Sequence, residues 1–326
     1  MKLAVAGATG MVGREILRVL EERIPASSIN ELYLFSSARS AGDKIIFNER
    51  EYTVEELTES SFDRGMDFAL FSAGGGTSKT FAPIAAAKGC VVIDNSSAWR
   101  TEPDVPLVVP EVNPEDAKLH KGIIANPNCS TIQAVVALKP LHDRYKIKRI
   151  VYSTYQAVSG AGALGYDDLV GTLAGNAPKK FQYVIAGNCI PHIDDFTENG
   201  YTKEEMKMIF ETRKIMRAPE LAITATTVRV PVYHGHSESV NVEFFNDFDL
   251  GELVEALRQA PGVIVRDNPQ NKEYPMPITA AGRDEVFVGR IRRDESVPSG
   301  VNLWVVSDNI RKGAATNAVQ ILELLM

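Results

Sequence analysis

The first residue whose setting suggests chemistry is Cys129. It lies in the run Asn126 to Thr131, after the apolar pair Ile123-Ile124 and before a helical stretch from Ile132 to Leu138. A thiol at such a strand-to-helix turn faces the positive end of the helix, which lowers the thiol pKa and leaves the sulfur accessible. The pattern favours a thiolate nucleophile, although a small buried hydrophobe is the more common role of a cysteine.

The other two cysteines show weaker patterns. Cys90 adjoins Val91-Val92-Ile93 and fits the role of a small buried hydrophobe, whereas the surroundings of Cys189 leave it unassigned. Three cysteines cannot all pair, and they are too few for a disulfide framework. The sequence therefore predicts a protein of a reducing compartment, the cytoplasm.

A run of glycines near the N-terminus has the features of a dinucleotide-binding turn. The apolar run Leu3 to Ala6 ends at Gly7, and residues at helical spacing follow Gly13. Backbone amides in such a turn point at a pyrophosphate, aided by the helix dipole. The spacing G-x-x-G-x-x-G is a variant of the usual fingerprint, and a merely tight turn is the alternative. The predicted cofactor contacts are Gly7, Thr9, Gly10, Met11, Val12 and Gly13.

The end of the second expected strand discriminates between nicotinamide cofactors. NAD-binding proteins usually place Asp or Glu there, to bond the ribose 2′-hydroxyl. Here Leu34-Phe35 leads into Ser36 to Ser40 with no acid and one arginine, Arg39. Hydroxyls and a guanidinium suit a 2′-phosphate, so NADP is predicted over NAD unless Arg39 is an ordinary solvated residue. The predicted contacts are Ser36, Ser37, Arg39 and Ser40, with Ser72 and Gly74 after the apolar run Phe68 to Phe71.

A thiolate beside a nicotinamide suggests transfer of hydride to a thioester, which needs a general acid or base. The chain has five histidines, and two of them form His234-Gly235-His236. On a strand these two side chains would share one face, because the side-chain period of a strand is two. A pair of solvated or core histidines is the alternative. No clustered metal-ligand pattern is present, so no metal is predicted.

Length and composition define the class of protein. The 326 residues predict about two domains. Hydrophobic residues at 44% and charged residues at 24% are typical of a globular chain and exclude a disordered one. A net charge of -7 argues against nucleic acid and anionic membrane surfaces as main partners. No apolar run approaches the ~18 residues of a membrane helix.

The elements that must position these residues change in character near residue 130. Before it, strand and helix signals alternate, which predicts parallel βαβ units with an antiparallel insertion at residues 45–54. After it, strands are expected at 147–158, 286–291 and 301–306, with two more within 222–245 around His234-Gly235-His236. Residues 314–326 form an amphipathic helix. The prediction is an α/β domain followed by an α+β domain.

These motifs together resemble the aspartate-β-semialdehyde dehydrogenase family over the whole chain. The resemblance rests on an ordered set of segments, Gly7–Gly13, Asn95–Arg100, Pro127–Thr131, Gln156–Gly162, Glu204–Lys207, Arg229–Val232, His234–Ser237 and Asp308–Gly313. It implies a Rossmann-type NADP-binding domain, residues 1–129 with the returning C-terminal helix 314–326. It also implies an α+β catalytic and dimerisation domain, residues 130–313, in a homodimer or a dimer of dimers.

The resemblance further implies a reaction and the residues that perform it. The reaction is NADPH-dependent reductive dephosphorylation of L-aspartyl-4-phosphate to L-aspartate-4-semialdehyde, in lysine, methionine and threonine synthesis. Cys129 resembles the thioester nucleophile, His236 the acid/base, with His234 as bystander, and Gln156 the residue that positions the acyl carbon. The implied substrate contacts are Arg229 for the α-carboxylate, Glu204 for the ammonium, and Arg100, Lys207 and Asn128 for phosphate. Implied cofactor contacts from the second domain are Ser159, Gly160 and Asn309.

Several alternatives stay open at this point. Glu204 and Lys207 stand three residues apart and could form an ordinary surface ion pair. Arg100 could be a solvated loop charge. N-acetyl-glutamyl-phosphate reductase uses the same thioester chemistry, but its motif typically has glycine before the cysteine, where this chain has Asn128. A non-catalytic NADP-binding regulator is a further alternative, although it predicts loss of Cys129, Gln156 or His236.

Overall fold

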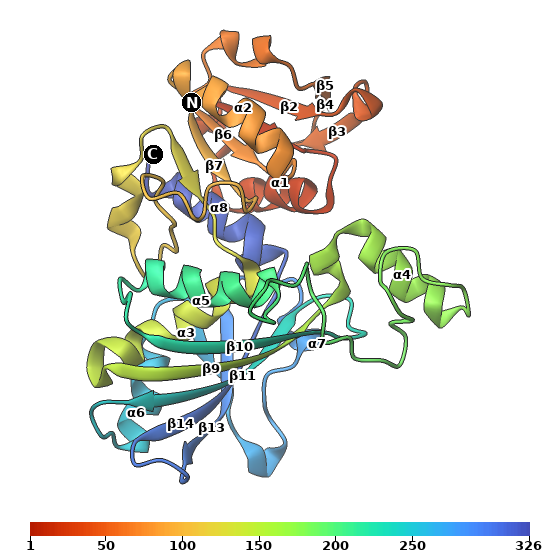
Figure 1. Ribbon diagram of the computed structural model, residues 1–326. Helices are drawn as coiled ribbons and strands as arrows, with labels where there is room; N and C mark the ends of the chain where they lie inside the picture. The colour runs from red at the N-terminus through yellow and green to blue at the C-terminus, as the bar shows by residue number, and fades with distance from the viewer. The chain divides into compact units, whose positions relative to one another are not determined.

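The computed structural model describes residues 1–326, and their packing divides the chain into two compact units. The first unit comprises Met1–Asn128 together with Ala314–Met326, and the second comprises Cys129–Gly313. Each unit has its own six-stranded sheet (Figure 1). No helix of the structure is both long enough and apolar enough to cross a membrane.

The first unit is built on a parallel sheet, as the alternating strand and helix signals predict. Its strand order is β5-β2-β1-β6-β7-β8, and every neighbouring pair is parallel. The strands are β1 Lys2–Ala6, β2 Glu31–Ser36, β5 Glu55–Glu56, β6 Phe68–Phe71, β7 Val91–Asp94 and β8 Ile123–Ala125, and the helices are α1 Met11–Arg23, α2 Gly75–Ala87 and α8 Thr316–Glu323. The predicted antiparallel insertion is confirmed as β3 Lys44–Phe47 paired with β4 Arg50–Thr53.

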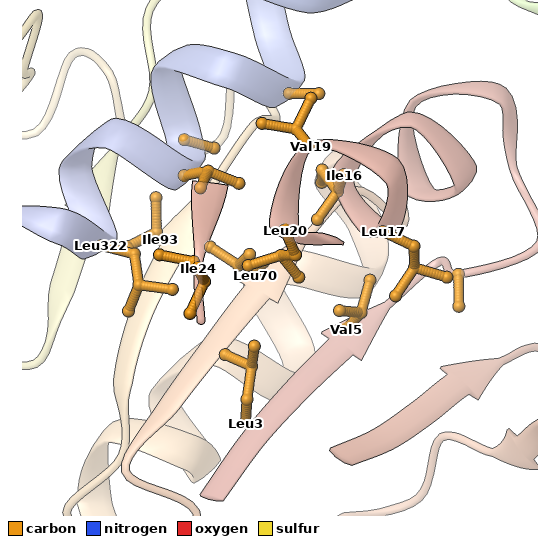
Figure 2. Close-up of a cluster of buried hydrophobic side chains, with 14 of the residues drawn as sticks. Leu3, Val5, Ile16, Leu17, Val19, Leu20, Ile24, Leu70, Ile93 and Leu322 are labelled. Carbon is orange, nitrogen blue, oxygen red and sulfur yellow. The ribbon is translucent and has the colours of Figure 1, made fainter. Parts of the chain in front are cut away.

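Side chains on the two faces of this sheet enter two different hydrophobic clusters. Leu3 and Val5 of β1 pack with Ile16 and Leu20 of α1 and with Leu322 of α8 (Figure 2). Alternate residues of the same strand join a second cluster, with α2 residues, on the opposite face. Parallel strands buried on both faces need such continuous apolar runs. The C-terminal helix thus returns to the first unit, as predicted, because its apolar face completes one of the two clusters.

The second unit contains the mixed sheet predicted for the residues after 130. Its strand order is β10-β9-β11-β14-β13-β12, with β9–β10 and β12–β13 parallel and the remaining pairs antiparallel. The strands are β9 Ile147–Gln156, β10 Ala222–Arg229, β11 His236–Phe244, β12 Val263–Val265, β13 Val286–Asp294 and β14 Gly300–Ser307. The helices are α3 Cys129–Tyr145, α4 Ala163–Leu173, α5 Lys203–Ile215, α6 Leu250–Arg258 and α7 Pro277–Ala280. Helix α3 packs against β9 and β11, and α5 packs against β10.

Strand β11 carries a carboxyl group into the core of this unit. Glu238 follows His236 by two residues, is fully buried, and has no hydrogen-bond partner on either carboxyl oxygen. Burial raises the pKa of Glu238 well above its ordinary value, and nearby Gln133 offsets this only in part. A charged carboxylate without a partner is too costly in the core, so Glu238 is held as a neutral acid.

Because Glu238 is neutral in the fold, we expect the difference in free energy of unfolding between Glu238→Gln and the parent protein to depend on pH. Folded Glu238 keeps its proton above about pH 4.5, the pH at which the unfolded chain releases it. The stability contributed by the carboxyl group is therefore complete below that pH and declines as the pH rises toward the raised folded pKa. The variant should gain stability over the parent protein by up to about 1.4 kcal/mol per pH unit in this window. Denaturant unfolding from pH 4.5 to 8 measures the difference.

The control is Glu243→Gln, which removes a carboxylate farther along the same strand, where it binds Lys148. A stability difference between Glu238→Gln and the parent protein that stays constant across the pH range would show that Glu238 is charged in the fold.

Candidate functional site

The glycine turn of the first unit leaves no room for side chains. Gly7 has φ +85, and a Cβ there would lie 2.4 Å from the carbonyl oxygen of Ser72. A Cβ on Gly13 would lie 2.1 Å from the carbonyl oxygen of Gly7. Glycine is therefore required at both positions, which bring β1, β6 and the first turn of α1 into close contact.

The predicted cofactor residues of the first unit gather at the carboxyl ends of β1, β2 and β6. Helix α1 begins after Gly10, which offers no side-chain cap, so the N–H groups of its first turn are available to an anion. The hydroxyls of Thr9 and Ser36 are 2.8 Å apart and join the first two strands. Beyond β2, Arg39 lies exposed in the short helical turn Ala38–Ser40. Ligands of open α/β sheets bind at this edge.

Arg100, also in the first unit, is anchored rather than solvated. Its Nε donates to the carbonyl of Asn126 at 2.9 Å, and its Nη2 donates to the carbonyl of Asn95 at 2.8 Å. The side chain is buried, which excludes the alternative of a loop charge in solvent. Asn95 and Asn126 directly follow β7 and β8, so the guanidinium is fixed at the carboxyl edge of the sheet. Asn128, two residues beyond Asn126, is buried as well.

The sheet of the second unit brings three of the predicted catalytic and substrate residues to one edge. Gln156 and Arg229 are the last residues of parallel strands β9 and β10 and pair in register. His236 is the first residue of β11, which runs antiparallel to β9, so it begins where β9 ends. Cys129 is the first residue of α3, as its position between a strand and a helical run predicts, and it is half-buried.

Gln156 links the start of α3 to α5. Its Nε2 donates to Ser130 Oγ at 2.8 Å and lies 3.3 Å from Glu204 Oε1. Ser130 directly follows Cys129, so the amide is held next to the thiol by a hydrogen bond. Gln156 and Glu204 are both buried. An amide fixed in this way can bind an acyl substrate without exchanging protons with it.

His236 is a neutral imidazole with a defined tautomer. It is fully buried, and its Nδ1 accepts the N–H of Ala157 at 3.0 Å. Burial, together with the nearby charge of Arg229, lowers the pKa of His236 well below its ordinary value. Because Nδ1 is an acceptor, the proton of the neutral ring is on Nε2, which has no partner in the protein. A Cβ on Gly160 would lie 3.2 Å from this nitrogen, so glycine keeps the space in front of it open.

The expectation that His234 and His236 share one face of a strand is wrong. His234 lies in the bend before β11, half-buried, and its ring packs on Tyr166 at 5.8 Å between centroids. Gly235, at φ +90, turns the chain between the two histidines. Strand periodicity does not apply to the pair because the ladder begins only at His236.

Arg229 is buried with one donor left over. Its Nη1 donates to the carbonyl of Ala157 at 2.6 Å, whereas its Nε has no partner. Burial lowers the pKa of Arg229, and the charges of Glu204 and Cys129 oppose this shift. Buried donors rarely stay unpaired, so the open Nε, like the open Nε2 of His236, marks a place for a ligand.

The pair Glu204 and Lys207 shares one face of α5, as its spacing predicts, with 3.1 Å between Lys207 Nζ and Glu204 Oε2. It is not an ordinary surface pair, because the Glu204 side chain is 7% exposed. Lys207 also binds Asp194, at 2.7 Å from its Oδ2.

The residues predicted to contact the cofactor from the second unit also come together. Asn309 Nδ2 donates to Ser159 Oγ at 3.0 Å, and Asn309 Oδ1 accepts the N–H of Gly235 at 2.9 Å. Ser159 and Asn309 are both buried. These bonds tie Asn309, the second residue after β14, to the turn after β9 and to the bend that precedes His236.

Three contributors were missed by sequence reasoning. The backbone of Ala157 holds both His236 and Arg229. The ring of Phe181 lies 5.9 Å from the Arg229 guanidinium carbon, and its segment is held by Asp168, which accepts the N–H groups of residues 179, 180 and 181. Asp194 binds Lys207. Backbone contacts and irregular segments carry no periodic signal, and only the adjacent acids Asp167 and Asp168 within a helical run could have pointed to Asp168.

The other two cysteines differ in burial. Cys90 is buried, as predicted, and desolvation raises the pKa of its thiol to about 12. Cys189 is exposed. No group of three or more His, Cys, Asp or Glu side chains is arranged to hold a metal ion.

Comparisons with known proteins agree with this geometry. The family model described as semialdehyde dehydrogenase, NAD binding domain, matches residues 2–120, and that described as semialdehyde dehydrogenase, dimerisation domain, matches residues 138–312. The chain is 59% identical to aspartate-semialdehyde dehydrogenase of Aquifex aeolicus (strain VF5), over 100% of this chain and 98% of the relative.

Two solved structures extend the comparison. Aspartate semialdehyde dehydrogenase II of Vibrio cholerae, complexed with ASA, superposes with a TM-score of 0.95 at 49% identity, over 99% of this chain and 97% of that one. The Candida albicans enzyme, with NADP, gives a TM-score of 0.77 at 26% identity, over 99% and 98% of the two chains. The family predicted from the motifs is confirmed: this chain belongs to the aspartate-semialdehyde dehydrogenase family.

Proposed function

We propose that this protein catalyses the NADPH-dependent reductive dephosphorylation of L-aspartyl-4-phosphate to L-aspartate-4-semialdehyde, a step in the synthesis of lysine, methionine and threonine. The observation that carries the proposal is the pair of buried, unpartnered donors, His236 Nε2 and Arg229 Nε, in the cluster that begins at Cys129. The relatives bear the name of this activity, and the Vibrio cholerae structure is a complex with ASA.

The proposed chemistry proceeds through Cys129. Its thiolate attacks the acyl carbon, the carbon–oxygen bond to phosphate breaks, and a thioester forms. NADPH supplies the hydride that reduces this thioester. In the acid/base role that the resemblance implies, His236 acts as the acid: its Nε2–H donates a hydrogen bond to the acyl oxygen and stabilises the negative charge that develops there. Hydride addition leaves an anionic thiohemiacetal, whose oxygen re-forms the carbonyl as the carbon–sulfur bond breaks, so the aldehyde and the Cys129 thiolate are released.

Different side chains bind the different charged groups of the substrate. Arg229 binds the α-carboxylate through its open Nε, and Glu204 binds the α-ammonium. Lys207, Arg100 and Asn128 bind the phosphoryl group. Three charged groups on one small substrate each need a charged or polar partner, and the buried residues supply one for each.

For the cofactor, we propose NADP over NAD. Strand β2 ends at Ser36, and residues 37–40 follow it with the hydroxyls of Ser37 and Ser40 and the guanidinium of Arg39 but no carboxylate. The NAD-binding domain of the family covers this segment, and the Candida albicans relative was solved with NADP. The pyrophosphate of the cofactor is bound by Gly7 to Gly13, Ser72 and Gly74. Its nicotinamide is bound by Ser159, Gly160 and Asn309.

The domain roles follow the two units. We infer a cofactor domain of residues 1–129 with 314–326, and a catalytic and dimerisation domain of residues 130–313. The match of residues 138–312 to a dimerisation domain supports a homodimer, and a dimer of dimers is the alternative. Three free cysteines suit a reducing compartment, and we propose that the protein works in the cytoplasm.

One assay separates this function from its rivals. The protein is given NADP and phosphate with either aspartate semialdehyde or N-acetyl-glutamate semialdehyde, and NADPH formation is followed. Phosphate-dependent NADPH formation with aspartate semialdehyde alone supports the proposal. Activity only with the acetylated aldehyde would identify the glutamyl branch. That outcome is disfavoured because buried Glu204 would face an uncharged amide. No turnover, with NADP still bound, would indicate a regulator.

The first prediction tests the nucleophile. Cys129→Ser should lose nearly all turnover, because a hydroxyl at that position is a far weaker nucleophile than a thiolate, while NADP binding stays unchanged. Steady-state rates measure the turnover, and titration with NADP measures cofactor binding. The matched control is Cys189→Ser at the exposed cysteine, which should keep full activity. Near-normal turnover of Cys129→Ser would rule out the thioester mechanism.

The second prediction tests the cofactor choice. Arg39→Ala removes a charge-assisted hydrogen bond to the 2′-phosphate, worth ~1.5–3 kcal/mol. The Michaelis constant for NADP should rise about ten-fold or more, while that for NAD changes little. Arg18→Ala, which removes an exposed arginine of the same unit, is the control. Equal use of NAD and NADP by the parent protein would contradict the assignment.

The third prediction separates the two anion sites. Arg229→Ala should weaken semialdehyde binding more than phosphate binding, and Lys207→Ala should do the reverse. Loss of a buried charged partner typically costs ~2–5 kcal/mol, because the remaining charge is left unpaired. Michaelis constants for both substrates are measured after NADP binding is shown to be normal. If the two variants exchanged these effects, the two roles would be assigned the wrong way round.

A further inference from the structure

Lys207 is held between two carboxylates before any substrate arrives. Its Nζ is 3.1 Å from Glu204 Oε2 and 2.7 Å from Asp194 Oδ2, so the shorter of these two contacts is to Asp194. The Lys207 side chain is 24% exposed and that of Asp194 is 33% exposed. Neither pair is fully screened by solvent, so their charges act strongly on any third ion that reaches the ammonium.

Asp194 is fixed in its position and charged. Its Oδ1 accepts the N–H of Asp195 at 2.9 Å, which leaves Oδ2 for Lys207. Its backbone is in the left-handed region, at φ +68, a conformation that aspartate and asparagine tolerate better than most residues. Burial opposes ionisation, but the bonds from Lys207 and from the Asp195 N–H outweigh it and hold the pKa of Asp194 below its ordinary value.

We propose that Asp194 is a specificity-determining residue that competes with the phosphoryl group for Lys207 and thereby keeps the affinity for inorganic phosphate low. The inference rests on the proposed function, in which Lys207 binds phosphate and Glu204 binds the substrate ammonium. Nothing in the family motifs of the sequence includes Asp194.

Counting charges shows why competition is expected. Lys207 carries one positive charge, and Glu204 and Asp194 together carry two negative charges, so the three side chains are net negative. When the substrate ammonium neutralises Glu204, Asp194 remains as the counterion of Lys207. A phosphate that accepts a hydrogen bond from Nζ then lies close to the carboxylate of Asp194, and like charges at that separation repel.

Weak phosphate binding suits the proposed direction of the reaction. Phosphate is the leaving group of the first step, and the thioester would be attacked in reverse if phosphate stayed bound. Asp194 favours release of phosphate, because the ion pair between Asp194 and Lys207 forms again as phosphate leaves. The intact acyl phosphate loses less binding affinity than free phosphate does, because its carboxylate and ammonium are bound by other residues.

Asp194→Asn tests this competition. Asparagine keeps one oxygen to accept the Asp195 N–H and tolerates the left-handed backbone, but it replaces the oxygen that accepts from Lys207 with an amide NH2 and removes the charge. In the phosphorylating direction, the Michaelis constant for phosphate should fall about five-fold, equivalent to about 1 kcal/mol. The constant for the semialdehyde should stay within about two-fold, and phosphate should become a stronger product inhibitor of the reductive direction.

The matched control is Asp195→Asn. This neighbour is 76% exposed and pairs with Lys203 at 2.6 Å, so its removal changes the net charge equally without touching Lys207. Its phosphate constant should not change.

The outcomes separate this inference from the function on which it rests. A lower phosphate constant in Asp194→Asn, but not in Asp195→Asn, supports the competition. A higher constant would show that Asp194 positions Lys207 for phosphate, and an unchanged one that it has no influence, and either result overturns the inference. If Lys207→Ala, measured in parallel, left phosphate binding unchanged, the proposed phosphate role of Lys207 would itself fail.

Discussion

The backbone of one residue, Ala157, holds the two most important buried nitrogen groups of the second unit. Its N–H fixes Nδ1 of His236, and its carbonyl fixes Nη1 of Arg229. This is possible because Ala157 directly follows β9, between the last residue of β10 and the first residue of β11. A slip of one residue in either strand pair would turn the side chains of the shifted strand to the opposite face of the sheet. The register of three strands is therefore the constraint on which the geometry of the proposed site depends.

The site is arranged in advance at a cost to stability. His236 Nε2 and Arg229 Nε are buried without partners, and such groups destabilise a fold until a ligand satisfies them. Glu238, two residues along β11, shows the same tension in the core, where it is tolerated by remaining neutral. Hydrogen-bond donors that are already desolvated and correctly oriented need no reorganisation when charge develops on a substrate. The stability lost in the free protein is in this way used for catalysis.

Under the proposed roles, the carboxylates around Lys207 weaken its binding of phosphate rather than strengthen it. A lysine with a single carboxylate partner would present a stronger anion site than one held by both Glu204 and Asp194. The arrangement suits an enzyme that must release phosphate as a product. Affinity for one part of a substrate can be kept low when its other parts are held by separate residues, which is the role we propose for Arg229.

The sequence by itself determined the division into a parallel α/β unit and a mixed second unit, the glycine turn, the place of Cys129 at a helix start, and the pairing of Glu204 with Lys207. These are local properties: hydrophobic period, glycine where no Cβ fits, and spacing along one helix. Tertiary structure alone decided the tautomer of His236, the exclusion of His234 from the strand, the anchoring of Arg100, and the contacts made by Ala157, Phe181 and Asp194. Each of these depends on contacts between segments far apart in the chain or on backbone groups that every residue carries, and neither leaves a pattern in the order of side chains.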